Sequence, residues 1–587
     1  MEKPYLSKVI NYARDIEPYG FIQIYAGVGS GKNYFINQLI TGYTSEDDDG
    51  TKHTVPPKTV LLITSRRAKV DELLNTEDMS VGSYVLEWEN GWPVDDLEEY
   101  FNSKKELTNA DGWGISRIHQ RSIACTNAAI EKYLQNHHIP ANTSTHLWQR
   151  FDFIVLDEAH SVLADASYQT SPYYVHELVN QAYKEFKAGN STCRVIVMTG
   201  SPKILSNFKL PQNSNHLDLM GTCRSVVPQS LSFVDTVEAK KDFCRRLANG
   251  ERVVYFANHI KRIFSIYAEL SPDLQEVTAF SFSQPERLDI NDPTQKNLLE
   301  RMKATESEIS EKQTLPENIK LLLTTSKNKE GINILNKDIK AMYVESHTEV
   351  DIVQMAGRVR EGIDVLYVVT DAGGFGKPES AWEYKFSSYR APIDALSIEP
   401  DQGLKELNLV EFANDFFCKL LQKNSIDLSE PFGRKPTYTY EKAQEFISFI
   451  HSKFPYIRYN YFTDEFVLYN DRKSSLDYYE EQSVAYANAS DDKEKLTALA
   501  QSWYPGIGII WPEGLQSQID RYLAENDLID TPYDNQTRAL IANGLGHIIG
   551  KQVNQLRATL GQYGYAEKDC SKNKNSSTYG MKKIIKL

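Results

Sequence analysis

Short, continuously apolar runs recur along the chain up to about residue 374, and amphipathic stretches follow them. The first run, FIQIY at 21–25, leads through a glycine-rich turn into apolar residues at helical spacing: Phe35, Ile36, Leu39 and Ile40. Further runs stand at 59–64, 151–156, 194–199 and 251–256. Buried strands that alternate with helices predict an α/β fold with parallel sheets, and the run at 251–256 opens a second lobe.

The alternation ends after Gly373 and Gly374, and the pattern from about 401 to 530 is mostly helical and rich in tyrosine. An aromatic cluster, FPYIRYNYF at 454–462, encloses Arg458. Such rings could stack on unpaired bases. Alternating tyrosines in a short strand are more often half-buried core, and we favour that interpretation.

The last segment, residues 537–587, holds nine Lys or Arg against two acids. The pattern predicts two helices, TRALIANGLG and KQVNQLRATLGQYG, joined by the short turn HIIG. Two strands, YAEKDC and YGMKKIIKL, then form a hairpin. This order resembles a winged helix-turn-helix, which implies a nucleic-acid-binding unit with Lys551, Gln552, Gln555 and Arg557 on its recognition helix. A solvated basic tail is the alternative.

Composition narrows the class of protein. With 587 residues and ordinary apolar and charged fractions, the chain is expected to be globular and to form three or four domains. Its six cysteines form no C-x-x-C pair, which favours a reducing compartment, the cytoplasm or a host's cytoplasm. No apolar run is long enough to span a membrane, and the N-terminus is too polar for a signal peptide. The net charge of −14 disfavours a polyanion partner overall, but the C-terminal segment is locally basic.

The turn at 26–31 has the composition of a phosphate cradle, with three glycines in six residues. Backbone N–H groups of such a turn bind phosphate, the helix N-terminus adds partial positive charge, and Lys32 neutralises the anion. The candidate ATP-binding residues are Gly27, Gly29, Ser30, Gly31, Lys32 and Asn33. The usual pattern places Ser or Thr after the lysine to ligate Mg²⁺, and Ala26 replaces its first glycine. An amide oxygen can also ligate a hard cation, so Asn33 is a candidate metal ligand, with a weakened ATPase as the alternative.

Polar side chains follow two of the predicted strands. Asp157 and Glu158 end the run FDFIVL, where a P-loop ATPase needs one carboxylate for Mg²⁺ and one to polarise the attacking water. Arg66 and Arg67 follow the run TVLLIT, at the edge where open α/β sheets place their ligand-binding loops. We therefore expect the first pair to be catalytic and the second to contact nucleic acid.

Asp157, Glu158, Ala159 and His160 spell the DEAH box, and the chain resembles the superfamily 2 helicases. Other landmarks follow in the order of that family over roughly residues 20 to 375, beginning with the strand that runs into 199–202. The segment 318–334 is similar to the fifth motif of the family, with Thr325, Gly331 and Asn333 among the matching positions. The resemblance implies that Gly331 and Asn333 join the ATP site and that Thr325 contacts nucleic acid.

The segment 351–362 resembles the sixth motif of the same family, with Gln354, Gly357 and Arg358 in place. The family usually carries a second arginine three residues after the first, and here that position is Glu361. Either Arg358 or Arg360 could therefore be the arginine that reaches the γ-phosphate from the other lobe. The segment QMAGRVR at 354–360 also resembles the sixth motif of the origin-binding helicases of herpesviruses.

The resemblance implies two tandem RecA-like parallel-sheet lobes, a mainly helical extension and a C-terminal winged helix-turn-helix. We expect the lobes over 1–225 and 226–398, the extension over 399–536 and the basic unit over 537–587. The expected activity is Mg²⁺-ATP hydrolysis coupled to strand separation or translocation on nucleic acid, with DNA favoured over RNA, in replication or repair of a mobile element. The expected catalytic residues are Lys32, Asp157, Glu158, Gln354 and Arg358 or Arg360. The expected nucleic-acid contacts are Arg66, Arg67, Thr325, Lys551 and Arg557.

Two alternatives from other classes stay open. The first is a motor that moves on duplex DNA without unwinding it, or that serves a nuclease or defence complex. The second is a nucleic-acid-binding module with a degenerate ATPase, for which Asn33 is the main indication. The helical extension is in addition a candidate surface for a protein partner.

Overall fold

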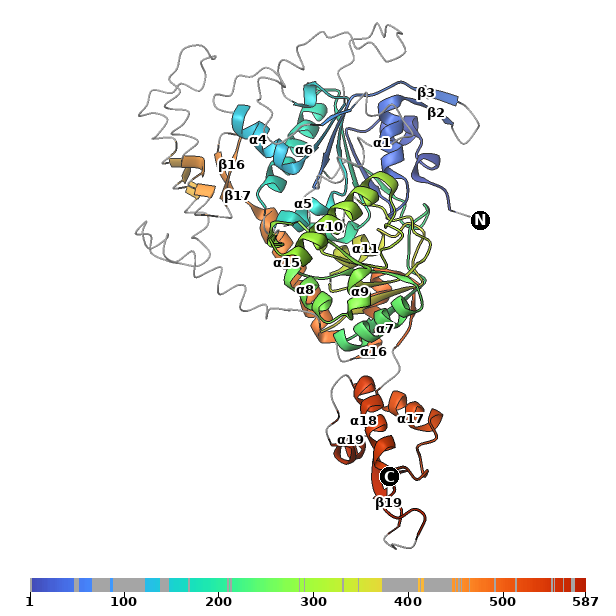
Figure 1. Cartoon of the computed structure of the whole chain (residues 1–587). Helices are drawn as coiled ribbons and strands as arrows, with labels where there is room; N and C mark the ends of the chain where they lie inside the picture. Colours follow the sequence, from blue (N-terminus) through green and yellow to red (C-terminus); the bar gives the residue numbers. More distant parts are fainter. Residues whose placement is uncertain are drawn as a thin grey trace.

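The computed structural model shows two RecA-like α/β lobes, each built on a parallel sheet, with a separate C-terminal unit beyond the second lobe (Figure 1). The residues it describes are all those outside the stretches 1–2, 47–51, 66–84, 88–121, 138–146, 167–168, 208–210, 212–213, 284, 290, 330–331, 347, 372–409, 412, 416, 418–445, 449, 452–453, 455–456, 464, 490–491, 512–514, 550–552, 554, 563 and 572–575. The expectations for Arg66, Arg67, Gly331, Lys551 and Gln552 therefore lie outside the described residues.

The first lobe holds a sheet with the strand order β5-β6-β4-β7-β8-β1-β9, in which every pair of neighbours is parallel. Its strands are β1 (Phe21–Tyr25), β4 (Val60–Thr64), β5 (Val85–Glu87), β6 (Ser122–Thr126), β7 (Phe153–Leu156), β8 (Arg194–Thr199) and β9 (Asn215–Asp218). Its helices are α1 (Lys32–Thr41), α4 (Asn127–His137), α5 (His160–Ala166) and α6 (Ser171–Lys187). Shorter elements are η1 (Leu6–Lys8), η2 (Tyr12–Ile16), η4 (Leu147–Gln149), η5 (Pro202–Asn207) and the hairpin β2 (Tyr43–Glu46) and β3 (Lys52–Val55).

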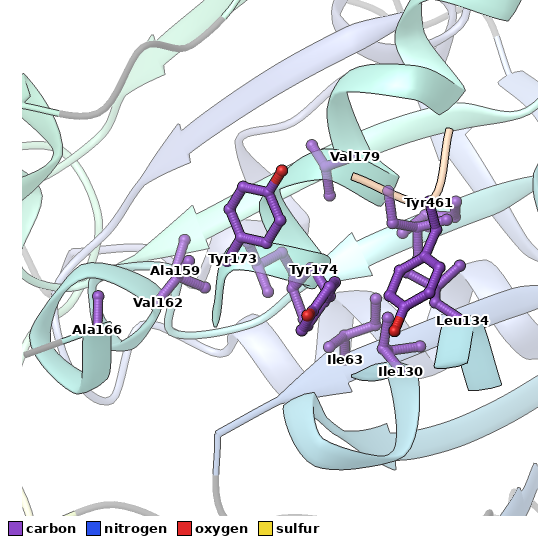
Figure 2. Close-up of a cluster of buried hydrophobic side chains, with 14 of the residues drawn as sticks. Ile63, Ile130, Leu134, Ala159, Val162, Ala166, Tyr173, Tyr174, Val179 and Tyr461 are labelled. Carbon is purple, nitrogen blue, oxygen red and sulfur yellow. The ribbon is translucent and has the colours of Figure 1, made fainter. Parts of the chain in front are cut away.

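Both faces of this sheet are covered, which explains why its strands appear as continuous apolar runs in the sequence. On one face, strand residues such as Ile24 and Met198 pack with Phe35 of α1. The other face packs against α4, α5 and α6. Figure 2 shows this second cluster, in which Tyr461 from the extension lies beside Leu134 of α4.

The second lobe holds a sheet with the order β12-β13-β11-β14-β15-β10-β18, again parallel throughout. Its strands are β10 (Ser230–Val234), β11 (Arg252–Phe256), β12 (Thr278–Ser281), β13 (Leu321–Thr324), β14 (Ile339–Val344), β15 (Val365–Val369) and β18 (Gly508–Ile509). Its helices are α7 (Thr236–Ala248), α8 (Ile260–Ala268), α9 (Pro272–Glu276), α10 (Pro293–Lys312) and α11 (Glu349–Ala356), with the short turns η6 (Pro285–Arg287) and η7 (Ser326–Asn328). Strand β18 comes from far along the chain, so the extension completes this sheet.

The extension divides its residues between the two lobes. Besides β18, it contains β16 (Ile457–Asn460), β17 (Glu465–Leu468), α15 (Asn470–Ala489) and α16 (Lys493–Trp503). The antiparallel hairpin β16–β17 packs on the first lobe, where the Asn460 Nδ2 donates to Glu177 Oε2 of α6 at 2.8 Å. Arg458, Tyr459 and Tyr461 are all buried there, which confirms the core interpretation of the aromatic cluster and leaves no exposed stacking platform on these three residues.

The described residues of the C-terminal unit form three helices and an antiparallel hairpin. They are α17 (Leu515–Glu525), α18 (Asn535–Ile549), α19 (Leu556–Gln562), β19 (Tyr565–Asp569) and β20 (Lys582–Lys586). The segment before α18 adds a third line of pairing to the hairpin, because Asp530 N donates to Ile584 O at 2.7 Å and Tyr533 N to Lys582 O at 2.8 Å. The predicted hairpin is present, whereas the predicted turn HIIG is wrong in part, since residues 547–549 continue α18.

This unit begins earlier in the chain than the sequence pattern suggested. Ile519 and Leu523 of α17 are fully buried in the same apolar cluster as Ile541 and Leu560. From 515 to 587 the chain has ten Lys or Arg and seven Asp or Glu, so the net charge of the packed unit is +3. The acids at 520–534 precede the segment 537–587, so counting that segment alone overstates the basic character of the unit.

One buried carboxylate connects the parts of the C-terminal unit. Glu567 of β19 is 3% exposed and accepts hydrogen bonds from Arg538 Nε of α18 at 2.7 Å and from Tyr533 OH at 3.0 Å. Lys582 Nζ of β20 lies 3.7 Å from its other oxygen. Burial acts to raise the pKa of Glu567, but the hydrogen bonds from Arg538 and Tyr533 and the nearby charges outweigh it, so the pKa lies below its ordinary value.

Acidification should therefore loosen the C-terminal unit. A carboxyl whose pKa is depressed by folding stabilises the fold above its unfolded pKa, and this contribution is lost as the pH falls through the folded pKa, below about 4.5. We expect protection of residues 528–587 from hydrogen exchange, corrected for intrinsic rates, to fall by roughly tenfold per unit of pKa shift across this range. Glu567→Gln should reduce protection at neutral pH and weaken this acid dependence, whereas Glu525→Gln, at an exposed position, should retain both. An unchanged acid profile in Glu567→Gln would contradict the assignment.

Candidate functional site

The glycine-rich turn connects β1 to α1 in a conformation that its glycines permit. Gly29 and Gly31 have φ of 82° and 91°, in the left-handed region that glycine enters without steric cost. Ser30 N donates to Gly27 O at 3.2 Å, and Phe35 N donates to Gly31 O at 3.0 Å. The chain therefore curls tightly between Ala26 and the first turn of α1, where a helix N-terminus favours an anion.

Lys32 directs its ammonium back into this turn. The side chain is 7% exposed, and its Nζ lies 3.1 Å from Ala26 O and 3.4 Å from Gly27 O. Glu158 Oε1 lies 3.6 Å from the same Nζ. A buried positive charge held against the backbone of a glycine-rich turn is suited to neutralise a phosphate bound there.

Asp157 and Glu158 follow β7, and β7 is separated from β1 by β8 alone. Since the strands are parallel, their carboxyl ends meet at one edge, which brings the two acids to the glycine-rich turn. Asp157 is buried, and its N–H donates to Ile63 O at 3.0 Å. Glu158 has φ of 51°, a left-handed conformation that costs a residue with a Cβ about 1–2 kcal/mol. Such strain is common at functional sites, and here it accompanies a carboxylate that lies close to Lys32.

His160 links this acid pair to the next strand. Its Nδ1 lies 3.4 Å from Glu158 Oε2 and 3.0 Å from Thr199 Oγ1 at the end of β8. Thr199 Oγ1 also accepts a hydrogen bond from Ser201 N at 3.0 Å. The DEAH segment and the segment 199–202 are therefore joined by buried polar contacts.

The second lobe contacts the first through α11 and the residues that follow it. Gln354 Nε2 donates to Ser201 Oγ at 3.2 Å across the lobes. Gly357 faces Val28 of the glycine-rich turn, and a methyl carbon added at Gly357 would stand 2.8 Å from Val28 Cβ. Polar contacts thus run from Glu158 through His160 and residues 199–201 to Gln354, and the lobes are closed on one another.

Arg358 and Arg360 differ in what they reach. Arg358 is 2% exposed and donates to Gln354 O at 2.9 Å, to Gln354 Oε1 at 3.0 Å and to Ile332 O at 3.3 Å, all within the second lobe. Arg360 donates through Nε to Asn333 Oδ1. Its Nη1 lies 3.6 Å from the position of a methyl carbon added at Gly29. Arg360 is therefore the arginine that reaches the glycine-rich turn, while Arg358 holds α11 and its C-terminal turn together.

The remaining candidates take varied positions. Asn33 is half-buried as the second residue of α1, directly after Lys32. Its amide oxygen and the Asp157 carboxylate are hard oxygen donors of the type that Mg²⁺ takes, with phosphates and water supplying the other ligands. Within the described part of the chain, no group of three or more His, Cys, Asp or Glu could hold a metal ion. Thr325 is buried and caps η7 by accepting from Lys327 N, and Arg557 is exposed on α19.

Two segments that sequence reasoning did not single out also line the glycine-rich turn. Leu6 N donates to Ser30 O at 2.9 Å, so the chain before β1 packs on the turn. Val226 N, from the connection between the lobes, donates to Val28 O at 2.8 Å. Neither segment carries a motif or a charge pattern, so no signal in the sequence could have placed them at the site.

Comparison with known proteins gives likenesses of structure alone. No family model and no curated protein sequence matches the chain. The structure is similar to Saccharomyces cerevisiae Dbp5 bound to RNA and ADP BeF3, with 13% identity, 62% of this chain and 83% of that chain covered, and a TM-score of 0.35. It is also similar to the Mycobacterium smegmatis helicase Lhr bound to ssDNA and AMP-PNP, with 9% identity, 81% and 60% covered, and a TM-score of 0.41.

A third similar structure is the helicase Mss116p bound to ssRNA and AMP-PNP, with 13% identity, 85% and 91% covered, and a TM-score of 0.37. At such low identity none of these likenesses assigns an activity to the chain. Within the described residues, no helix is both long and apolar enough to cross a membrane.

The contact between the lobes should be sensitive to a single added methyl group. Gly357→Ala would place a Cβ against Val28, so we expect the lobes to separate and the radius of gyration in small-angle scattering to increase. Val28→Gly in the same chain removes all the obstructing carbons and should restore the compact value. Gly221→Ala is a suitable control because no atom lies within 4 Å of its added Cβ. A Gly357→Ala protein as compact as the parent would show that this contact does not hold the lobes together.

Proposed function

We propose that the chain is a superfamily 2 motor of the DEAH-box type, which hydrolyses ATP between its two lobes and uses the cycle to separate or move along nucleic acid strands. The observation that carries the proposal is the convergence of three groups at one sheet edge. The glycine-rich turn with Lys32, the pair Asp157 and Glu158, and Arg360 from the second lobe all meet there. The same groups serve phosphoryl transfer in P-loop ATPases.

In this proposal each residue has a separate task. Lys32 and the turn bind the β- and γ-phosphates, and Glu158 polarises the water that attacks the γ-phosphate. Asp157 and Asn33 would hold Mg²⁺, which supplies charge neutralisation to the phosphates. Arg360 stabilises the negative charge that develops in the transition state, and it can do so only while the lobes are closed.

The buried contacts between the lobes support a coupling of hydrolysis to movement. Glu158 contacts His160, which contacts Thr199, and the adjoining Ser201 is bonded by Gln354 of the second lobe. A change in charge at the γ-phosphate would therefore be transmitted through these contacts to Ser201, which binds Gln354 of α11. Repeated closure and release would then change the spacing of two surfaces that grip nucleic acid.

The architecture of the C-terminal unit supports a winged helix-turn-helix as part of this machine. Helices α17, α18 and α19 are followed by the hairpin β19–β20, and the segment at 529–533 pairs with β20. In this assignment α19 is the recognition helix, with Gln555 just before it and Arg557 on it, both exposed. Lys583 and Lys586 pair with Asp530 and Asp520 of the same unit, so the helix and not the hairpin would supply the main contacts to nucleic acid.

The proposal is tested by ATP hydrolysis measured with single-stranded and duplex DNA and RNA. We expect at least one of these to stimulate hydrolysis, and a strand-displacement assay then separates a helicase from a motor that does not unwind. Glu158→Gln should bind ATP but lose on the order of 10²-fold or more of kcat, because only the group that activates water is altered. Glu286→Gln, at an exposed position on η6, should hydrolyse ATP normally. No hydrolysis under any condition would favour the nucleic-acid-binding module.

The two arginines should respond differently to substitution. Arg360→Ala should lower kcat by roughly 10³-fold, because the side chain acts on the transition state, and should lower the melting temperature less than Arg358→Ala, because its hydrogen bond to Asn333 is only partly buried. Arg358→Ala should lower the melting temperature, because Gln354 and the Ile332 carbonyl lose a buried partner. Arg287→Ala on η6 serves as an exposed control. If Arg358→Ala abolished turnover in a protein of normal stability while Arg360→Ala stayed active, the roles would be the reverse of those assigned.

A further inference from the structure

Lys203 and Glu349 form an ion pair across the lobes. Lys203 belongs to η5 of the first lobe, and Glu349 is the first residue of α11 in the second. Lys203 Nζ lies 2.9 Å from Glu349 Oε2. The same Nζ donates to Ser502 O of α16 at 2.5 Å, so the extension also takes part in the junction.

This pair is more sheltered than an ordinary surface pair. The Glu349 side chain is 9% exposed, although Lys203 is 51% exposed. Burial raises the pKa of Glu349, and the contact with Lys203 opposes that rise. Exposed ion pairs contribute little, but a sheltered carboxylate that loses its cation is strongly disfavoured. Closing the lobes is therefore what gives Glu349 its positive partner.

Helix α15 of the extension covers the junction from outside and contacts both lobes. Tyr478 belongs to the apolar cluster of the first lobe, whereas Tyr486, two turns later, belongs to that of the second. Between them, Gln482 Oε1 accepts from Glu349 N at 3.4 Å. Burial and then the charge of Glu349 raise the pKa of Tyr478, which is consistent with the two groups lying close together. In Figure 1, α15 runs along the side of the molecule where the two lobes meet.

The position of Glu349 on α11 connects this junction to the candidate active site. Helix α11 runs from Glu349 to Ala356, and Gly357 and Arg360 follow directly. Gln354, near its other end, is bonded to Ser201 of the first lobe. A helix of this length is about 12 Å long and stiff, so attachment near both ends sets its tilt as well as its position. Arg360 lies four residues after Ala356, the C-terminal residue of α11, so the tilt of this helix affects where Arg360 points.

We propose that Lys203 and Glu349 form a latch that holds α11 against the first lobe and thereby positions Arg360 at the phosphates; this rests on the proposed function. Lys203 is therefore a positioning residue, because it would affect the reaction only through its contact with α11. The backbone carbonyl of Ser502 and the side chain of Gln482 make the extension a third member of the latch.

A double-mutant cycle in the full-length chain tests the latch. Lys203→Met and Glu349→Gln should each lower kcat for ATP by about fivefold, with KM for ATP within about twofold of the parent. The double variant should be no slower than either single variant, because the interaction can be lost only once. Lys203→Arg keeps the charge and should retain near-parental kcat. The matched control is Lys240→Met with Glu269→Gln, an exposed pair of the same length, 2.9 Å, within the second lobe. These control variants should leave kcat unchanged.

A second measurement separates failure of the latch from failure of the proposed activity. Small-angle scattering without nucleotide should give a larger radius of gyration for Lys203→Met than for the parent, at an unchanged melting temperature. If the parent shows no hydrolysis but Lys203→Met still opens the lobes, the proposed activity is overturned and the latch stands. The latch is overturned if kcat and the radius of gyration both stay at parental values, or if the two substitutions reduce kcat multiplicatively.

Discussion

Because Gly357 has no Cβ, the second lobe can pack directly against the glycine-rich turn. The geometry of the candidate site depends on this contact. Val28 fills the space that a Cβ at Gly357 would need, so the turn and the end of α11 are in direct contact. Gln354 can reach Ser201, and Arg360 can reach the neighbourhood of Gly29, only because the backbones come this close. Close packing makes such a contact all-or-none, since interiors tolerate little deformation. The contact between Gly357 and Val28 therefore favours one defined closed arrangement of the two lobes.

Much of the fold and part of the site could be predicted, because they follow from short continuous stretches of the sequence. The apolar runs at 59–64, 151–156, 194–199 and 251–256 correspond to β4, β7, β8 and β11, since parallel strands are buried on both faces. The glycine-rich turn and the acid pair end such strands, and the strand order brings them together. The spacing of Arg358 and Arg360 could not show which of them approaches the glycine-rich turn, because their burial and their contacts to Gln354 and Asn333 depend on the tertiary structure.

The rest could not be predicted because its partners lie far apart in sequence. Asn460 bonds to Glu177, and Lys203 bonds to the carbonyl of Ser502, each across some hundreds of residues. The division of the extension between the two lobes follows from such contacts, and no periodicity encodes them. The basic character of the C-terminus was overstated for the same reason. The acids that pair with Lys583 and Lys586 stand before the boundary that the helical pattern suggested.

The way in which β18 joins the second sheet sets the reach of the C-terminal unit. Ile509 is the last residue of β18, Ile510 N still donates to Leu231 O at 2.8 Å, and α17 begins at Leu515. With only four residues between them, Ile510 and Leu515 lie at most about 18 Å apart in any conformation of the chain. A C-terminal unit joined to β18 by so few residues is confined to a small volume, which corresponds to an effective concentration in the millimolar range. If the C-terminal unit binds nucleic acid as proposed, a strand that the lobes release would therefore stay within reach of the second lobe, and rebinding would compete well with diffusion into solution.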